Sequence, residues 1–290
     1  MPQSSQGAVQ CISPAGLHTM RFMQWGDPRN PRVLLCVHGL ARVGGDFAHL
    51  ARELCGHYRV VCPDVVGRGA SDWLRNPAYY QVGQYVSDMV ALIARLDVEQ
   101  VDWLGTSMGG LIGIGLAGLE HSPVRRLVLN DVGPQLELAG LLRIGNYVGV
   151  KMHFDDLAQA VAYTRSVAPG FGMRSQAQWQ ELTALTLKPD GAGFRLHYDP
   201  AIGVPLRAMT PELVAAGEKM LWQLYDGITC PTLLVRGECS DLLSAEAAAA
   251  MAARGPRPRC VSIPGVGHAP MFFDPDQIAV VRDFLLEAPQ

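Results

Sequence analysis

Residues 105–109 read Gly-Thr-Ser-Met-Gly, a G-x-S-x-G pattern with a serine between two glycines. The apolar run VDWLG (101–105) before it predicts a strand, and the apolar segment LIGIGLA (111–117) after it predicts a helix. Small residues in such a strand-to-helix junction permit a sharp turn that projects the Ser107 hydroxyl. The structural alternative is that Ser107 only caps the helix and the glycines form a tight loop. On the first interpretation Ser107 is a candidate nucleophile.

A serine is a weak nucleophile at neutral pH unless a base and an orienting acid accompany it. His268 follows the last predicted strand in the glycine-rich segment IPGVGHAP, and Asp241 lies just beyond the penultimate one in LLVRGECSDLLS. The chain order serine, aspartate, histidine is that of a Ser-Asp-His triad at successive strand ends. Taken singly, His268 could cap a loop and Asp241 could cap a helix. The three together predict a Ser107–His268–Asp241 triad.

A second carboxylate competes for the acid position. Asp131, in LVLNDVGP, lies at the end of another predicted strand. We expect Asp241 to be the acid, because one strand-helix-strand-loop unit separates it from His268, and we expect Asp131 to position the entrance to the inserted segment.

An anionic tetrahedral intermediate needs backbone N–H donors beside the serine. The N–H of Met108 begins the predicted helix, and the N–H of Leu40 follows His38-Gly39 at the end of a buried strand. We expect these two N–H groups to form an oxyanion hole, with His38 in a structural role that holds the loop.

The elements that must position these residues alternate between strands and helices. Short apolar runs predict strands at 33–39, 58–65, 101–105, 126–131, 231–237 and 259–265, with an early antiparallel pair near 9–12 and 19–24. Helical spacing is found at 45–55, 82–96, 244–255 and 276–288. This alternation predicts an α/β fold with a mostly parallel sheet covered on both faces.

The alternation fails between about residues 133 and 225, where helical segments such as DDLAQAVAYTRSV and SQAQWQELTALT follow one another without an evident strand. We therefore expect a core made of residues 1–133 and 226–290, with a helical cap at 134–225 inserted between two strands.

Several motifs together resemble the α/β-hydrolase superfamily, in its capped branch of esterases, lactonases and carbon–carbon bond hydrolases. They are His38-Gly39, PDVVGRGASD, GTSMGG, LVLNDVGP, Asp241 and GVGHAP. The resemblance covers both ends of the core and leaves the inserted segment unassigned. It implies an eight-stranded, mostly parallel sheet, a metal-free Ser-His-Asp triad and hydrolysis through an acyl-enzyme.

Within this superfamily the nucleophile separates the reactions. Epoxide hydrolases and haloalkane dehalogenases have a carboxylate at the position that Ser107 occupies here, so attack on a carbonyl carbon is favoured. We expect a carboxylic ester hydrolase for short to medium acyl chains. The alternatives are an enol-lactone hydrolase, a hydrolase of a carbon–carbon bond in a diketone, and a noncatalytic receptor that keeps the fold.

Substrate contacts are expected from the inserted segment, whose aromatic side chains suggest a hydrophobic acyl or alcohol group. Arg143, Tyr147, Trp179 and Trp222 are the candidates, with Arg143 a possible partner for a substrate carboxylate. The alternative is that the aromatic residues pack the inserted helices together and that Arg143 faces solvent.

Composition excludes several other classes of protein. The chain has 290 residues, 49% of them hydrophobic, and a net charge of −3, which predicts a large core and gives no reason to expect nucleic acid. Its seven scattered cysteines contain no C-x-x-C pair, and GIGLAG lies inside a predicted helix, so we expect neither a metal nor a dinucleotide. Without an apolar span or a signal segment, a cytoplasmic protein acting on a small ester or lactone is expected.

Overall fold

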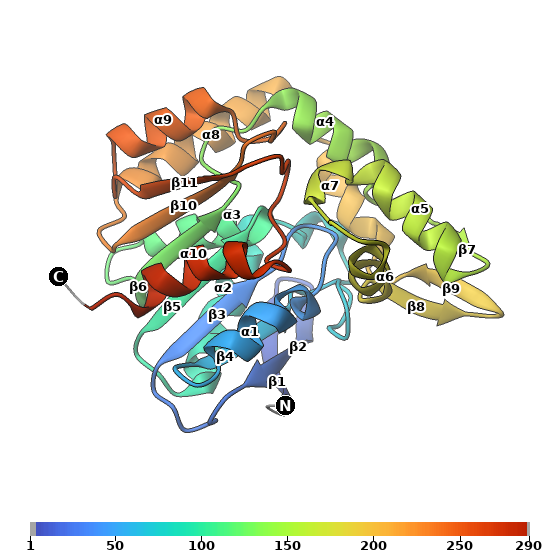
Figure 1. Cartoon of the computed structure of the whole chain (residues 1–290), viewed down its shortest axis with the longest axis horizontal. Helices are drawn as coiled ribbons and strands as arrows, with labels where there is room; N and C mark the ends of the chain where they lie inside the picture. The colour runs from blue at the N-terminus through green and yellow to red at the C-terminus, as the bar shows by residue number, and fades with distance from the viewer. Residues whose placement is uncertain (1–3, 289–290) are drawn as a thin grey trace.

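The computed structural model describes residues 4–288, and its largest element is an eight-stranded sheet in the order β1-β2-β4-β3-β5-β6-β10-β11 (Figure 1). The strands are β1 (Ser5–Ser13), β2 (Gly16–Trp25), β3 (Val33–Val37), β4 (Arg59–Asp64), β5 (Val101–Thr106), β6 (Val124–Asn130), β10 (Thr232–Gly237) and β11 (Arg259–Ile263). β2 pairs antiparallel with β1 and β4, and all other neighbours are parallel. The expected fold class is confirmed.

Alternate residues of the central strands face two separate cores, because successive side chains of a strand point to opposite faces. In β3, Leu35 faces a core that α2 (Val82–Leu96), α3 (Met108–Ala117) and α9 (Ala245–Ala253) cover. Its neighbour Leu34 faces the core under α1 (Ala48–Leu54) and α10 (Pro275–Leu286), the two helices in front of the sheet in Figure 1. The continuous apolar runs of the sequence follow from this burial on both faces.

Between β6 and β10 the chain forms an insertion, most of which lies to the right of the sheet in Figure 1, while its last helix is drawn at the upper left beside α9. Its helices are α4 (Leu138–Tyr147), α5 (Leu157–Val167), α6 (Gln176–Ala184), α7 (Gly203–Arg207) and α8 (Pro211–Asp226). It also contains a three-stranded antiparallel sheet, β7-β9-β8, made of β7 (His153–Phe154), β8 (Leu187–Asp190) and β9 (Gly193–Leu196). The expectation of helices alone is therefore wrong.

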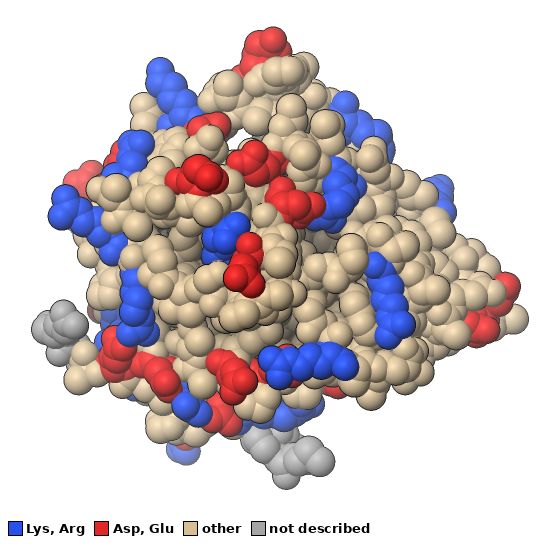
Figure 2. Space-filling view, turned by 45° about the horizontal axis from the view of Figure 1, so that its top comes forward, with Lys and Arg blue, Asp and Glu red and all other residues tan. Residues whose placement is uncertain are grey.

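Short 3-10 helices complete the described elements. They are η1 (Gly44–Phe47), η2 (Pro77–Tyr79), η3 (Pro169–Phe171) and η4 (Pro200–Ile202). Residues 4–288 contain no helix with the length and hydropathy needed to cross a membrane. On the face drawn in Figure 2, acidic and basic side chains are interspersed over the surface.

Candidate active site

Ser107 lies in a sharp turn between β5 and α3. Its backbone has φ +52° and ψ −116°, a conformation that is strained for a residue with a side chain. The turn depends on both flanking glycines: a Cβ on Gly105 would lie 2.2 Å from the Gly109 carbonyl oxygen, and one on Gly109 would lie 2.0 Å from that of Val37. The two glycines of the G-x-S-x-G pattern are therefore required for the tight turn that carries Ser107.

The His268 imidazole connects Ser107 to a buried carboxylate. Its Nε2 lies 2.9 Å from Ser107 Oγ, and its Nδ1 lies 2.7 Å from Asp131 Oδ2. When Nδ1 carries the proton and donates to Asp131, Nε2 is free to accept the proton of the serine. This geometry allows general-base activation of a serine hydroxyl.

Asp131 is fully buried, and three donors satisfy its carboxylate. The Gly237 N–H donates to Oδ1 at 2.8 Å, and Ser240 Oγ donates to Oδ2 at 2.6 Å, in addition to the contact with His268. The backbone at Asp131 has φ +55°, in the left-handed region that Asp tolerates better than most residues. This turn at the end of β6 aims the carboxylate at β10 and His268.

The expectation that Asp241 serves as the acid beside His268 is contradicted by this arrangement. The Asp241 carboxylate instead accepts hydrogen bonds from Arg143 Nε at 2.5 Å and from Nη2 at 2.8 Å. These charge-assisted hydrogen bonds hold the pKa of Asp241 below its usual value. Asp241 lies in the loop after β10. It directly follows Ser240, whose hydroxyl donates to Asp131.

Leu40 and Met108, whose N–H groups are the two proposed donors, line one pocket together with Ser107. Within residues 4–288, neither backbone N–H donates a hydrogen bond to a protein acceptor. His38 fixes the loop: Nδ1 donates to the Gly39 carbonyl at 2.7 Å, and Nε2 accepts from the Val65 N–H at 3.0 Å. Because that carbonyl and the Leu40 N–H share one planar peptide unit, the imidazole also fixes the direction of the N–H. Burial lowers the pKa of His38 to about 3, so the ring is neutral.

Arg68, from the PDVVGRGASD motif, is a residue whose role sequence reasoning missed. Its guanidinium is fully buried, donates to the Leu40 carbonyl at 2.8 Å and approaches Met108 Sδ at 3.5 Å. The Val66 carbonyl and the Tyr85 hydroxyl accept its Nη1 donors. Among the described residues no carboxylate pairs with it within 4.0 Å, so a cation without an ionic partner supports both residues expected to form the oxyanion hole.

Asn130 ties three parts of the site together and was also missed. Its carbonyl accepts from the Ser107 N–H at 3.0 Å. Its Nδ2 donates to Thr106 Oγ1 at 2.9 Å and to the Pro270 carbonyl at 2.8 Å, in the loop that carries His268. The available signal was a polar Asn-Asp pair at the end of a buried strand.

Two cavities meet at Ser107. The first, which we call the histidine-side pocket, has a volume of about 90 Å³, and its lining includes Arg42, Ser107, Arg143, Tyr147, Tyr163 and His268. The second, the methionine-side pocket, has about 350 Å³, and its lining includes Ser107, Met108, Leu111, Leu141, Leu206 and Leu221. The insertion contributes walls to both pockets.

Two of the four expected substrate contacts lie elsewhere. Arg143 and Tyr147 line the histidine-side pocket. Trp179 is instead buried against Leu182 and Phe273, and Trp222 packs edge-on against Tyr225. Both tryptophans therefore pack against other side chains, as in the alternative expectation for the aromatic residues of the insertion.

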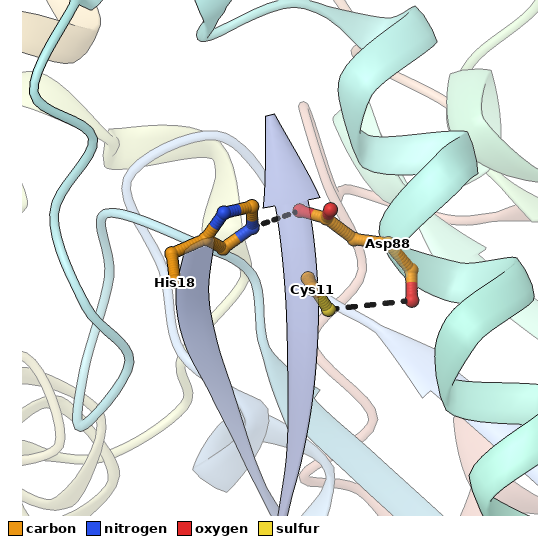
Figure 3. A group of neighbouring side chains, drawn as sticks. All are labelled: Cys11, His18 and Asp88. Atoms are coloured by element: carbon orange, nitrogen blue, oxygen red, sulfur yellow. Dashed lines mark hydrogen bonds and ion pairs between the residues drawn. The ribbon is translucent and has the colours of Figure 1, made fainter. Parts of the chain in front are cut away.

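A cluster of Cys11, His18 and Asp88 lies away from these pockets, between β1, β2 and α2 (Figure 3). His18 Nε2 lies 3.0 Å from Asp88 Oδ2, and Gln84 donates to Oδ1 at 2.7 Å. Although the three side chains could approach one metal ion, burial raises the pKa of the Cys11 thiol to about 12, which disfavours the thiolate that a metal binds. The contacts describe a polar brace between the first hairpin and α2.

Comparisons with known proteins show the family of the chain. A profile of the alpha/beta hydrolase family matches residues 34–281, which include Ser107, Asp131 and His268. The chain belongs to the alpha/beta hydrolase family. It is 56% identical over 286 residues to the 3-hydroxybutyrate-oligomer hydrolase of Cupriavidus necator, covering 97% of this chain and 98% of that one.

Two solved structures show the same architecture. An alpha/beta hydrolase from Novosphingobium aromaticivorans is 34% identical, with a TM-score of 0.86 over 98% of this chain and 99% of that one. A hydrolase described as putative, from Rickettsia typhi, is 28% identical, with a TM-score of 0.87 over 99% and 100% of the two chains. The insertion is included in these matches, because they span nearly the whole chain.

Proposed function

We propose that the protein is a carboxylic ester hydrolase that uses Ser107 as nucleophile, His268 as general base and acid, and Asp131 as the acid that orients His268. The observation that carries this proposal is the continuous connection from Ser107 Oγ through both ring nitrogens of His268 to Asp131. Asp131 takes the role that the sequence analysis gave to Asp241.

In the acylation step, His268 Nε2 removes the hydroxyl proton while Ser107 Oγ attacks the ester carbonyl carbon. The Leu40 and Met108 N–H groups stabilise the resulting oxyanion, and buried Asp131 stabilises the imidazolium. The proton then passes from Nε2 to the leaving alkoxide as the ester C–O bond breaks. Water, activated by the same imidazole, next attacks the acyl-serine, releases the acid and restores Ser107.

The substrate class proposed is a short oligoester of a 3-hydroxy acid. This follows from the 56% identity to a 3-hydroxybutyrate-oligomer hydrolase over nearly the full length of both chains. The two pockets on either side of Ser107 fit a substrate that continues in both directions from the scissile ester. We propose that the insertion, residues 134–225, acts as a cap that limits the length of the bound chain and excludes water.

The cellular location proposed is the cytoplasm. All seven cysteines are free, and Cys11, Cys36 and Cys62 are buried as small core side chains. Free thiols of this kind are typical of a reducing compartment.

The test is hydrolysis of linear 3-hydroxybutyrate dimer and trimer by the wild-type protein, followed by chromatography of the products, beside a p-nitrophenyl ester series. We expect turnover of both oligomers and loss of all turnover in Ser107→Ala. A protein that binds the oligomers without cleaving them, and that does not cleave p-nitrophenyl butyrate either, would be a receptor. Cleavage of a diketone substrate faster than of any ester would assign it to carbon–carbon hydrolysis instead.

A further inference from the structure

The two pockets at Ser107 differ in the groups that line them, and this difference gives the substrate a direction. The histidine-side pocket contains Arg42, which pairs with Asp46 in the same lining, and the cation Arg143, together with tyrosine and threonine hydroxyls. The methionine-side pocket is mostly aliphatic, and Glu218 is its one charged lining residue among those described. An oligoester has two chemically different ends, so the pockets can distinguish them. The inference below rests on the proposed function.

The position of His268 decides which part of the ester each pocket receives. The leaving oxygen must take its proton from His268 Nε2, so the alcohol part lies on the side that His268 lines. His268 lines the histidine-side pocket and not the methionine-side pocket. The acyl part, which stays on Ser107 after the C–O bond breaks, then extends past Met108 into the methionine-side pocket.

In a linear oligoester of a hydroxy acid, the alcohol part of every ester bond carries the free carboxylate end, and the acyl part carries the free hydroxyl end. We propose that the histidine-side pocket recognises the carboxyl-terminal unit, with Arg143 pairing its carboxylate and Tyr163 donating a hydrogen bond to it. Hydrolysis then releases one hydroxy acid monomer from the carboxyl end, while the rest of the chain forms the acyl-enzyme.

Arg143 is held in place for this contact. Its Nε and Nη2 donate to Asp241, and its Nη1 donates to the Val167 carbonyl at 3.1 Å. These three bonds leave two of the five guanidinium N–H groups without a carboxylate or backbone acceptor in the described part of the chain. Asp241 therefore acts as the residue that orients Arg143, which accounts for a carboxylate that the triad does not use.

Tyr163 supplies an unused donor. Its hydroxyl is buried, lines the same pocket and has no hydrogen-bond partner among the described residues. Burial raises the pKa of Tyr163 to about 12, so the hydroxyl keeps its proton at neutral pH. An unpaired buried hydroxyl is costly, and a bound carboxylate or ester oxygen would satisfy it.

The volumes of the pockets indicate how many units each holds. At about 10–15 Å³ per water-sized site, the 90 Å³ of the histidine-side pocket corresponds to roughly six to nine such sites, enough for one small hydroxy acid. The methionine-side pocket, at about 350 Å³, has room for a longer chain. The monomer is therefore expected on the alcohol side and the longer fragment on the acyl side.

The decisive experiment uses a 3-hydroxybutyrate trimer labelled with ¹³C in its carboxyl-terminal unit. In the first turnovers of wild-type protein, the label should appear in the monomer and the dimer should be unlabelled. Label in the dimer with unlabelled monomer would overturn the direction while leaving ester hydrolysis intact. Failure to cleave the trimer, with normal turnover of p-nitrophenyl butyrate, would overturn the proposed substrate class and this inference with it.

Recognition of the carboxylate is tested with the trimer and its methyl ester. The readout is the ratio of kcat/KM for the two, which cancels any general loss of activity in a variant. The free acid should be favoured by about tenfold in wild type, the scale of one hydrogen bond to a charged group. Arg143→Gln should reduce the ratio to about one, and Tyr163→Phe should reduce it partly.

The matched control is Arg165→Gln on the neighbouring helix α5, whose guanidinium stacks over Trp179 and donates to Gln176 away from both pockets. It should keep the wild-type ratio. An unchanged ratio in Arg143→Gln, or no preference for the free acid in wild type, would overturn the assignment.

Discussion

Asp241 forms a two-point ion pair with Arg143, at 2.5 and 2.8 Å, and leaves the position beside His268 to Asp131. The two aspartates follow different strands, β10 and β6, and each has a distinct set of partners. Asp131 is fully buried, whereas the Asp241 side chain is 46% exposed. Their substitution by asparagine should therefore have very different consequences.

The first prediction compares Asp131→Asn with Asp241→Asn in turnover of p-nitrophenyl butyrate at neutral pH. Asp131→Asn should lose about three to four orders of magnitude in kcat, because an amide favours the wrong imidazole tautomer and cannot stabilise the imidazolium. Asp241→Asn should stay within about tenfold of wild type, because a partly exposed ion pair contributes little. A loss of kcat on that scale in Asp241→Asn alone would instead identify Asp241 as the acid that orients His268.

The nucleophile is tested by Ser107→Ala and His268→Ala, each of which should leave a folded protein with kcat reduced at least about a thousandfold. A fluorophosphonate should label Ser107 in wild type and give no adduct in Ser107→Ala, as judged by peptide mass spectrometry. The control is Ser122→Ala, because the Ser122 hydroxyl accepts a hydrogen bond from the Val124 N–H and contacts neither His268 nor Asp131 in the described part of the chain. Near wild-type turnover in Ser107→Ala, with contaminating hydrolases excluded, would contradict the triad.

Sequence reasoning predicts the sheet well, because strands that are buried on both faces appear as continuous apolar runs. VLLCV in β3, for example, has all five residues buried. The Ser107 turn is predictable for a related reason. Its two glycines are required by backbone contacts of 2.0 and 2.2 Å that any Cβ would make.

The choice of acid could not be made from the sequence, because Asp131 and Asp241 both follow parallel strands at the same edge of the sheet. What decides it is the backbone at Asp131, at φ +55°, together with donors from Gly237 and Ser240 on another strand and loop.

The strands of the insertion could not be predicted from the sequence for a different reason. β7 has two residues and β8 and β9 have four each, too few to show an alternating pattern.

Arg68 provides a third prediction. Arg68→Met removes the donors that hold the Leu40 carbonyl and the guanidinium beside Met108, so kcat should fall by about a hundredfold, with a smaller change in KM. Arg68→Lys keeps the charge and should restore part of the loss. We calculate kcat from the concentration of active sites that react with a fluorophosphonate, so that unfolded protein does not lower the measured value.

The matched control for Arg68 is Arg126→Met. Arg126 is also buried and donates to the backbone carbonyls of Phe284 and Glu287. It pairs in register with Asp102, five residues before Ser107 in the chain and towards the opposite end of β5. It should lower the melting temperature without lowering kcat per reactive site. Equal losses of kcat in the two variants would show that Arg68 acts only through stability.

His38 gives a prediction on pH. Its pKa is about 3 in the folded protein, because burial disfavours the charged ring, against 6.5 for an exposed histidine. Below pH 6.5 the unfolded chain therefore binds a proton that the folded chain does not, and stability falls as the pH is lowered towards 3. The contribution of this one group approaches about 1.4 kcal/mol per pH unit in that window.

His38→Gln should be less stable at pH 7, because the Gly39 carbonyl and the Val65 N–H lose their partner, and its stability should depend less on pH between 6.5 and about 4. Urea denaturation across this range measures both effects. His121→Gln, at a side chain 92% exposed, serves as the control and should follow the wild-type curve. Parallel curves for His38→Gln and wild type would mean that His38 does not carry this pH dependence.

The last prediction concerns acyl length, which the methionine-side pocket should control. With p-nitrophenyl esters of rising chain length, kcat/KM should first increase by up to about fourfold per methylene, the equivalent of about 0.8 kcal/mol of burial, and then fall when the chain meets the wall. Leu221→Trp adds volume to that wall and should move the optimum to a shorter chain. Leu119→Trp, at a side chain 46% exposed outside both pockets, should leave the optimum in place. A steady rise to long chains would indicate an open, lipase-like surface, and an unshifted optimum in Leu221→Trp would place the acyl chain on the other side of Ser107.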